Sequence, residues 1–197
     1  MARWEPNPRE RLERAALALF VEHGYEATTV AGIADRAGLT KSTFFRHFAD
    51  KREVLFGGQD ALADGFGEAI RTAPPGTASV DLLAAALLAA APFFGPERHD
   101  LGRQRRTVIA ANSELQEREL LKRARLAAVI ADALRERGTP ETAARLAAEV
   151  GVLAFGTAYA RWAEPDNRQP YPQIAHAVLA ELRACAADLG AQAPAPA

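Results

Sequence analysis

The chain has 197 residues, enough for one ordinary domain or for a small domain joined to a larger one. Its 24 Lys and Arg residues and 25 Asp and Glu residues give a formal net charge of -1, so the chain as a whole lacks the basic character typical of nucleic-acid binders. Ala, Leu and Arg are abundant and aromatic residues make up only 7%, a composition that favours helices. We therefore predict an all-α fold and exclude an all-β fold.

The sequence also bears on location and cofactors. The single cysteine, Cys185, cannot form an internal disulfide, so the chain does not depend on an oxidising compartment. The N-terminus is charged where a signal peptide would be apolar, and no uncharged stretch reaches the roughly 20 residues of a membrane span. His99 and His176 lack metal-ligand spacing. We expect a cytoplasmic protein with no membrane partner, no metal and no organic cofactor.

The N-terminal region carries the spacing and end signals of short helices. An apolar stripe from Leu12 follows the helical repeat, with Asn7 as its capping residue and Gly24 at its end. Further signals predict a second helix from Thr29 to Gly38, a third from Thr40 to Phe48, and a fourth that starts at Asp50 and continues to Thr72.

The remaining chain is predicted to be helical too, after a break at Pro74-Pro75-Gly76. Helices are expected over residues 79–94, ended or kinked by Pro92, and over 101–111, 113–138, 139–162 and 173–189. The Pro165–Pro172 segment has the composition of an exposed linker, and residues 191–197 are expected to be disordered.

Two of the short helices have the form of a helix-turn-helix. The connection from Ala37 to Thr40 is a glycine-containing turn of the length that sets one helix across another. At about 100° per residue, Phe44 and Phe48 share one face of the third helix, while Arg46 lies opposite with two short polar residues. A helix anchored by two phenylalanines and presenting such groups suits the major groove of DNA.

Local charge agrees with this interpretation. Between Ala27 and Arg52 the chain has five basic and two acidic residues, a net charge of +3. Backbone N–H groups at the starts of the second and fourth helices, beside Thr29 and Lys51, are natural phosphate sites because the positive end of the helix dipole lies there.

The stretch from Arg9 to Phe56 contains the pattern FxxxGYxxTTVxxIAxxAGLTKSTFFRHFxxK. It resembles the N-terminal DNA-binding domain of the tetracycline-repressor family of bacterial transcription regulators. The resemblance implies an all-α homodimer that binds palindromic operators, with a C-terminal domain that binds a small molecule and releases DNA. Members commonly have Tyr where this chain has Phe45, so a hydroxyl that could bind phosphate is replaced by a ring that can only stack or make van der Waals contact.

The resemblance also implies which side chains contact DNA. The expected phosphate contacts are Thr29, Thr40, Lys41, His47 and Lys51; Ser42, Thr43 and Arg46 are expected near base edges, and Phe45 beside them. Without the resemblance, other interpretations stay open for three of these residues. His47 is compatible with a solvated surface residue and Arg46 with a contact to phosphate alone. Lys51 is compatible with a surface cation that only happens to stand at a helix start.

We expect a DNA-binding domain over residues 1–56 and a helical effector-binding and dimerisation domain over residues 57–190. The small N-terminal domain buries too little surface to dimerise alone, so the last two long helices are expected to form a four-helix bundle with a second subunit. The expected interface residues are Val150, Gly151, Ala154, Phe155, Ala158, Ile174, Ala177, Val178, Leu182 and Cys185. An intramolecular core is the alternative use of the same residues.

A small-molecule effector is expected among the central helices. Aromatic residues are predicted to wall its site, with two polar residues that fix its orientation: Phe66, Phe93, Phe94, Tyr159 and Trp162, with Arg106 and Asn112. Each aromatic residue could equally be plain core. Two other functions stay open: a DNA-binding repressor or activator without an effector, and an enzyme on an all-α scaffold, for which no phosphate loop, metal spacing or partnered nucleophile is found.

Overall fold

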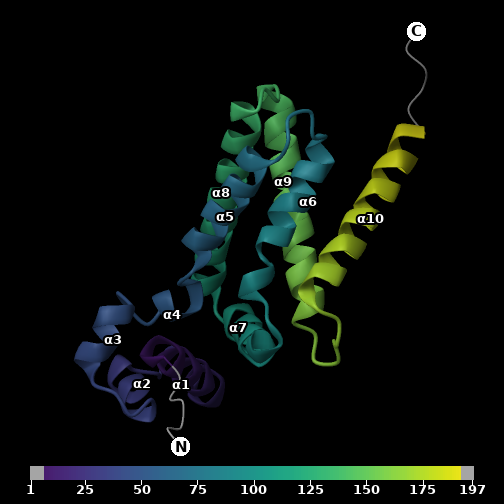
Figure 1. The fold of residues 1–197 in the computed structure, drawn as a ribbon. Helices are drawn as coiled ribbons and strands as arrows, with labels where there is room; N and C mark the ends of the chain where they lie inside the picture. The colour runs from purple at the N-terminus through teal and green to yellow at the C-terminus, as the bar shows by residue number, and fades with distance from the viewer. Residues whose placement is uncertain (1–6, 192–197) are drawn as a thin grey trace, which may run out of the picture. The chain divides into compact units, whose positions relative to one another are not determined.

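A computed structural model describes the backbone of residues 7–191 and the side chains of residues 7–188. Within that range all regular structure is helical and there is no strand, which confirms the predicted all-α fold (Figure 1). The segment 192–197, part of the expected disordered tail, lies outside the described residues.

The helices follow one another with short connections. The α-helices are α1 Pro8–His23, α2 Val30–Arg36, α3 Lys41–His47, α4 Glu53–Phe56, α5 Gln59–Thr72, α6 Ser79–Ala89, α7 His99–Ala110, α8 Ser113–Glu136, α9 Glu141–Trp162 and α10 Tyr171–Ala191, and two 3-10 turns, η1 Ala91–Phe93 and η2 Pro96–Arg98, stand between α6 and α7. Pro92 lies in η1 and ends α6, as predicted.

The single helix predicted from Asp50 to Thr72 is wrong. The chain instead forms one turn of helix, α4, and then a separate helix, α5. Gly57 leaves α4 in extended backbone (φ -62°, ψ 131°) and Gly58 has φ +95°, a conformation that glycine adopts without steric cost. Two consecutive glycines therefore redirect the chain, although the apolar spacing continues across them.

The helix ends predicted in the N-terminal region are confirmed. The Asn7 side chain accepts a hydrogen bond from the N–H of Arg9 at 3.1 Å, and α1 ends at Gly24. Gly38 has φ +63° and follows α2, where the N–H of Leu39 donates to the carbonyl of Ala34 at 2.8 Å. This bonding pattern satisfies carbonyls that the helix end leaves free.

The described chain divides into two compact units. The first comprises the residues up to Asp60 together with Asp100–Lys122, and the second comprises Ala61–His99 and the chain from Arg123 onward. The first unit thus contains more than the N-terminal helices, because α7 and the first part of α8 belong to it.

The core of the first unit explains why α7 and α8 contribute to it. Leu101, Val108 and Ile109 from α7 and Leu115 from α8 are buried in the same cluster as the apolar residues of α1 to α4. Four short helices bury little surface by themselves, so the additional leucine, valine and isoleucine side chains enlarge a core that would otherwise be marginal.

The second unit has an alanine-rich core between long helices. Gly151 of α9 lies so close to α6 that a Cβ atom there would be 3.0 Å from Leu83 Cδ2. Arg161 of α9 pairs with Glu181 of α10 at 2.7 Å, and Arg183 of α10 pairs with Asp81 of α6 at 2.7 Å. Small side chains thus allow close helix approach, and ion pairs border the contacts.

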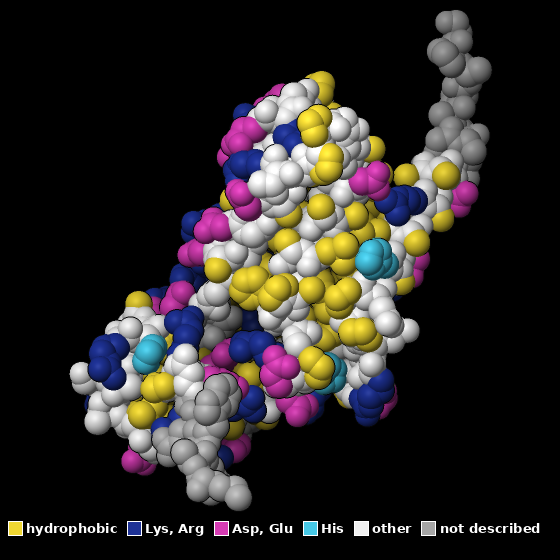
Figure 2. Space-filling view, viewed as in Figure 1, with side chains coloured by type: hydrophobic (Ala, Val, Ile, Leu, Met, Phe, Trp, Pro, Cys, Tyr) yellow, Lys and Arg dark blue, Asp and Glu magenta, His cyan; other side chains and the backbone are white. Residues whose placement is uncertain are grey.

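Helix α6 is apolar on most of its circumference, with four residues buried against its neighbours. Hydrophobic side chains are also visible on the face of the second unit over α6 and α9 (Figure 2). Among the described residues no single helix is long and apolar enough to cross a bilayer. The segments Ser79–Phe93 and Pro96–Ala110, which are bent by 71° relative to each other, reach the required length and apolar composition only when taken together.

Candidate nucleic-acid interface

Helices α2 and α3 are held by threonine caps. The hydroxyl oxygen of Thr29 accepts a hydrogen bond from the N–H of Gly32 at 3.1 Å, and that of Thr40 accepts one from the N–H of Thr43 at 3.1 Å. Each cap satisfies an N–H group that the first helical turn leaves free and lets the helix begin abruptly after the loop. The two threonines expected to contact phosphate therefore also fix where α2 and α3 start.

Helix α3 is anchored on one side and open on the other. Phe44 is 0% exposed and Phe48 3%, with their ring centroids 5.5 Å apart, whereas the neighbouring Phe45 is 56% exposed. Lys, Arg and His side chains are visible at the surface over α3 (Figure 2). The exposed or half-buried residues of α3 are Lys41, Ser42, Thr43, Phe45, Arg46 and His47.

Two of these side chains are cations that are exposed to solvent. Lys41 is exposed and forms no hydrogen bond or ion pair with another described residue. Arg46 is exposed as well, and its guanidinium lies 3.5 Å from the hydroxyl of Thr43. Both cations can reach an anionic partner without breaking a strong internal contact.

Lys51 has an internal role that sequence reasoning did not assign to it. Its ammonium donates to the carbonyls of Tyr25, Glu26 and Thr28 at 2.8, 3.3 and 3.3 Å and lies 4.2 Å from the centre of the Tyr25 ring. Burial raises the pKa of Tyr25 to about 12, so the ring is neutral beneath the ammonium. Lys51 therefore ties the start of α4 to the loop between α1 and α2.

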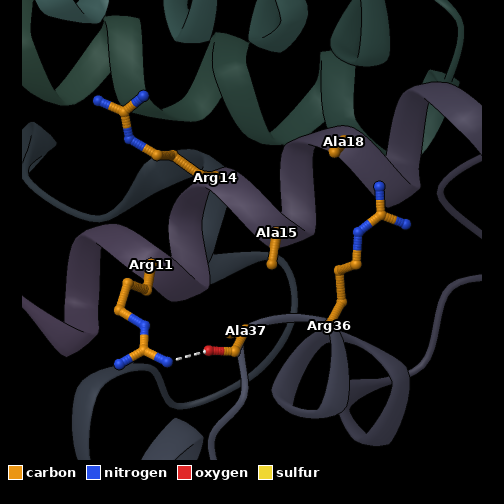
Figure 3. A pocket seen from close by; sticks show the side chains of 6 residues that line it. All are labelled: Arg11, Arg14, Ala15, Ala18, Arg36 and Ala37. Atoms are coloured by element: carbon orange, nitrogen blue, oxygen red, sulfur yellow. Dashed lines mark hydrogen bonds between the residues drawn. The ribbon is translucent and has the colours of Figure 1, made fainter. Parts of the chain in front are cut away.

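Two arginines of α1 bind helix C-termini. Arg9 donates to the carbonyl of His47 at 3.1 Å and lies over the Phe48 ring, and Arg11 donates to the carbonyl of Ala37 at 2.6 Å (Figure 3). Cations are favourable at helix C-termini because free carbonyls give that end a partial negative charge. Periodicity could not reveal these bonds, since the partners lie 38 and 26 residues away.

A hollow of about 320 Å³ lies beside Arg11, between α1 and α2 (Figure 3). Two other arginines line it, but both are paired: Arg14 with Glu10 at 2.8 Å, and Arg36 with both carboxylate oxygens of Glu22 at 2.9 and 3.1 Å. The guanidinium of Arg36 in turn lowers the pKa of Glu22. Because glutamates balance these guanidiniums, the hollow is not a bare cationic site.

The start of α4 is capped by a carboxylate. Asp50 Oδ1 accepts a hydrogen bond from the N–H of Glu53 at 2.9 Å, and its other oxygen pairs with Arg52 at 2.9 Å. Asp50 therefore takes one of the N–H groups that the sequence assigned to a phosphate at this helix start. Arg52 also pairs with Glu114 of α8 at 3.2 Å.

Helix α4 is held from α7 and α8 within the first unit. The guanidinium of Arg105 donates to the carbonyl of Leu55 at 2.7 Å and pairs with Glu119 at 3.3 Å. The guanidinium carbons of Arg105 and Arg118 lie 5.4 and 5.6 Å from the centre of the Phe56 ring. A helix of one turn cannot be stable by itself, so these contacts position it.

Most of the aromatic residues predicted for an effector site come together in the second unit. Six rings form a group that we call the aromatic cluster: Phe66, Phe94, Phe155, Tyr159, Trp162 and Tyr171. Phe94 is its hub, with ring centroids 5.1 Å from Trp162 and 4.5 Å from Tyr171. Phe93 is half-buried against the same core.

The two polar residues predicted for that site lie elsewhere. Arg106 and Asn112 belong to the first unit. Asn112 Oδ1 accepts from the N–H of Leu115 at 3.1 Å, and Nδ2 donates to Glu26 at 3.1 Å, so this amide caps α8 and binds the loop after α1. Its place directly before Ser113 is the sequence signal of such a cap.

Tyr171 was missed, because its segment reads as an exposed linker. It is instead the first residue of α10, 0% exposed, and its hydroxyl oxygen has no hydrogen-bond partner among the described residues. Burial raises the pKa of this hydroxyl far above its usual value. Leaving a buried hydroxyl unpaired costs about 1–3 kcal/mol, so its position is unusual for a side chain that only fills space.

The residues predicted for a dimer interface differ in exposure. Most are buried or half-buried inside the second unit: Val150, Gly151, Ala154, Phe155, Ala158, Ile174, Val178 and Leu182. Ala177 and Cys185 of α10 are exposed. The large apolar side chains that α9 exposes are Leu146, at 64%, and Leu153, at 69%, which sequence reasoning missed although their spacing of seven places them on one helix face.

The N-terminal region has relatives among regulators of transcription. Residues 13–57 match the family model described as bacterial regulatory proteins, tetR family. The transcriptional regulator TcmR of Streptomyces glaucescens is 44% identical over 68 residues, 34% of this chain and 30% of that protein. The transcriptional repressor KstR2 of Mycobacterium tuberculosis is 47% identical over 57 residues, 29% and 26% of the two chains. Each match spans less than a third of the relative's length.

Solved structures share the fold over most of the chain. The TetR family regulator PfmR of Thermus thermophilus is 27% identical with a TM-score of 0.52, over 86% of this chain and 94% of that one. FadR of the same organism, a TetR family repressor solved with lauroyl-CoA, is 24% identical with a TM-score of 0.53, over 96% and 99%. The N-terminal region thus matches the tetR family of bacterial regulatory proteins, and most of the chain shares the fold of a solved TetR family regulator.

Proposed function

We propose that the protein is a transcriptional repressor that binds a palindromic operator as a homodimer and is released by a small-molecule effector. The observation that carries the proposal is α3, which buries Phe44 and exposes Arg46 with short polar side chains on the other side. Such a helix enters the major groove, where arginine pairs with guanine and a threonine methyl group contacts thymine. Because operator DNA lies in the bacterial cytoplasm, the proposal includes a cytoplasmic location.

The proposed DNA contacts divide into two kinds. Residues for the phosphate backbone are Thr29, Thr40, Lys41, His47 and Lys51, and residues near base edges are Ser42, Thr43, Phe45 and Arg46. Phosphate contacts set affinity and its salt dependence, whereas base contacts set sequence preference. The exposure of Lys41 and Arg46 supports these two roles, and the caps by Thr29 and Thr40 leave nearby N–H groups at helix starts.

DNA binding is tested directly. Fluorescence anisotropy with the promoter beside the protein's own gene should give saturable binding that weakens as salt rises. We expect competitor DNA of random sequence to displace the protein at least ~1000-fold less effectively than the promoter. Equal competition by random DNA would contradict a sequence-specific regulator. Chemical conversion of a bound small molecule by the protein would instead favour the alternative that it is an enzyme.

We further propose that residues 57–190 supply dimerisation and effector binding, and that α9 and α10 of two subunits form the dimer. Leu146 and Leu153 support this, because large apolar side chains on one helix face are exposed in the single chain. Ala177 of α10 is exposed as well and allows close helix approach. The buried members of the predicted set serve the intramolecular core in the same helices.

The chain offers a matched pair of variants for the dimer. Leu153→Glu should give a monomer by light scattering and lose operator binding, since a charge would be buried in the proposed interface. Leu121→Glu is the control: Leu121, on α8, is 71% exposed against 69% for Leu153, and this variant should stay dimeric. If both variants stay dimeric, the exposed face of α9 is not the dimer interface.

The effector is supported by the aromatic cluster and by the relatives. FadR of Thermus thermophilus was solved with lauroyl-CoA, which indicates that this fold can hold a ligand with a long apolar part. In our proposal the effector binds in the second unit and lowers affinity for the operator by shifting the population of dimer conformations. A repressor or activator without an effector is the second candidate, and it predicts operator binding that no compound bound by the second unit alters.

A further inference from the structure

The unpaired hydroxyl of Tyr171 indicates what kind of effector the second unit recognises, an inference that rests on the effector-responsive function proposed above. Tyr171 is 0% exposed, and its hydroxyl has no hydrogen-bond partner among the described residues. Buried hydroxyls almost always have a partner, and one that lacks it in the free protein is a natural donor for a ligand.

The ring that covers Tyr171 lies in irregular backbone. Phe94 stands between η1 and η2 with φ -125° and ψ 46°, outside any helix. It is half-buried, and its ring centroid is 4.5 Å from that of Tyr171. A side chain in such a connection can rotate away at less cost than one on a helix, because fewer backbone bonds fix it.

The other rings of the aromatic cluster define the shape and polarity of a ligand. Phe155 and Tyr159 are stacked at 16° with centroids 6.5 Å apart, and Tyr159 and Trp162 are stacked at 27° with centroids 6.1 Å apart. Nearly parallel rings favour flat molecules. The cluster consists of phenylalanine, tyrosine and tryptophan, which carry no charge. The ring of His99 adjoins it, 5.4 Å from that of Trp162, but its Nε2 lies 3.1 Å from the carbonyl oxygen of Glu164 and is engaged there.

We propose that the hydroxyl of Tyr171 donates a hydrogen bond to the effector, and that the effector is an uncharged, flat, ring-containing molecule with a carbonyl oxygen, bound where Phe94 now covers Tyr171. The ligand's rings take the place of the Phe94 ring against Tyr159 and Trp162. Its carbonyl oxygen accepts the hydrogen bond that the hydroxyl makes with no described residue of the free protein. The site thus rejects hydrocarbons of the same shape, which leave the hydroxyl unpaired, and carboxylates, which lose their hydration without gaining a cation.

A matched pair of probes tests the hydrogen bond. The bicyclic ketone 1-indanone and its parent hydrocarbon indane differ in one carbonyl group. Binding is followed without DNA by the indole N–H resonance of Trp162, identified with Trp4→Phe because the chain has two tryptophans. We expect wild-type protein to bind 1-indanone at least ~5-fold more tightly than indane, and Tyr171→Phe to bind the two equally.

Tyr25→Phe is the control, since it removes a hydroxyl from a buried tyrosine of the first unit, outside the aromatic cluster, and should keep the preference for 1-indanone. In the absence of probe, Tyr171→Phe should melt at or slightly above the wild-type temperature, because the lost hydroxyl has no partner among the described residues. No binding of 1-indanone to the wild-type protein, an unchanged preference in Tyr171→Phe, or a melting temperature lowered by more than about 3 °C would each overturn the proposal. Because operator binding is measured separately, failure here leaves the DNA-binding function standing, and failure of operator binding does not alter these titrations.

Discussion

The two units of the chain differ in how their polar side chains are used. In the first, threonines cap helices, and Lys51, Arg11 and Arg105 each donate to a backbone carbonyl of another element. In the second, charged side chains such as Arg161 and Arg183 form ion pairs at the surface, around a core of small apolar residues. In the first unit such bonds to carbonyls hold the helix-turn-helix and α4 in place, whereas in the second Arg137 makes them after α5, with the carbonyls of Arg71, Ala73 and Pro74. Both units have a packed apolar core.

Likeness to other proteins differs with the length that is compared. The matched relatives are 44% and 47% identical over 68 and 57 residues. A packed helical core accepts many apolar combinations of the same volume, so solved structures share the fold at 24% and 27% identity.

The largest expected effect compares two fully buried phenylalanines, one in each unit. Phe44→Ala and Phe66→Ala should each lower the free energy of unfolding by about 3–5 kcal/mol, measured by urea denaturation, because both rings are 0% exposed. Below the unfolding transition, Phe44→Ala should lose operator binding while Phe66→Ala retains it. Loss of binding in both would mean that the two units do not function separately.

A second pair compares two lysines of the first unit. Lys51→Ala should lower the free energy of unfolding by about 1–2 kcal/mol, since the ammonium donates to three carbonyls, and if Lys51 also contacts phosphate it should reduce the salt dependence of binding. Lys41→Ala should leave stability within about 0.5 kcal/mol and lower the salt slope by about 0.9. Equal stability of the two variants would contradict the internal role of Lys51.

Arg46 separates base contacts from phosphate contacts. Its replacement by alanine should cost about 1–3 kcal/mol of preference at a single base pair of the operator, and leave the melting temperature unchanged because the side chain is exposed. Binding to a set of operators, each with one base pair changed, measures this effect. Uniform weakening across the set would assign Arg46 to the phosphate backbone instead.

The smallest effects concern two glycines, of which one stands where a Cβ atom is unfavourable and the other where a Cβ atom fits. Gly38 of the first unit has φ +63°, and a Cβ atom there would be 3.1 Å from the Arg11 guanidinium, so Gly38→Ala should lose about 1 kcal/mol. Gly65 in α5 of the second unit has no heavy atom within 4 Å of such a Cβ, so Gly65→Ala should gain about 0.5–1 kcal/mol. Thermal denaturation gives both signs, and destabilisation by Gly65→Ala would show that the second unit is less tolerant than its packing suggests.

Local signals predicted much of the helical structure and of the recognition helix. Asn7, Thr29, Thr40 and Gly38 occupy the caps that their residue types indicate, because a cap depends on atoms three or four residues away. The break at Gly57 and Gly58 was missed, since apolar spacing continues across it. Tyr171 was missed because prolines and polar residues around it resemble a linker.

By itself the sequence determined the all-α fold and the side chains that α3 presents, since both follow from spacing along one helix. Only the tertiary structure decided that Leu115 completes the first core, that Lys51 holds the loop after α1, and that the hydroxyl of Tyr171 is buried without a partner among the described residues. These facts depend on contacts between segments far apart in the chain, which a repeat of 3.6 residues does not encode. The net charge of -1 likewise hides a local difference, because residues 27–52, on the helices proposed to bind DNA, have a net charge of +3.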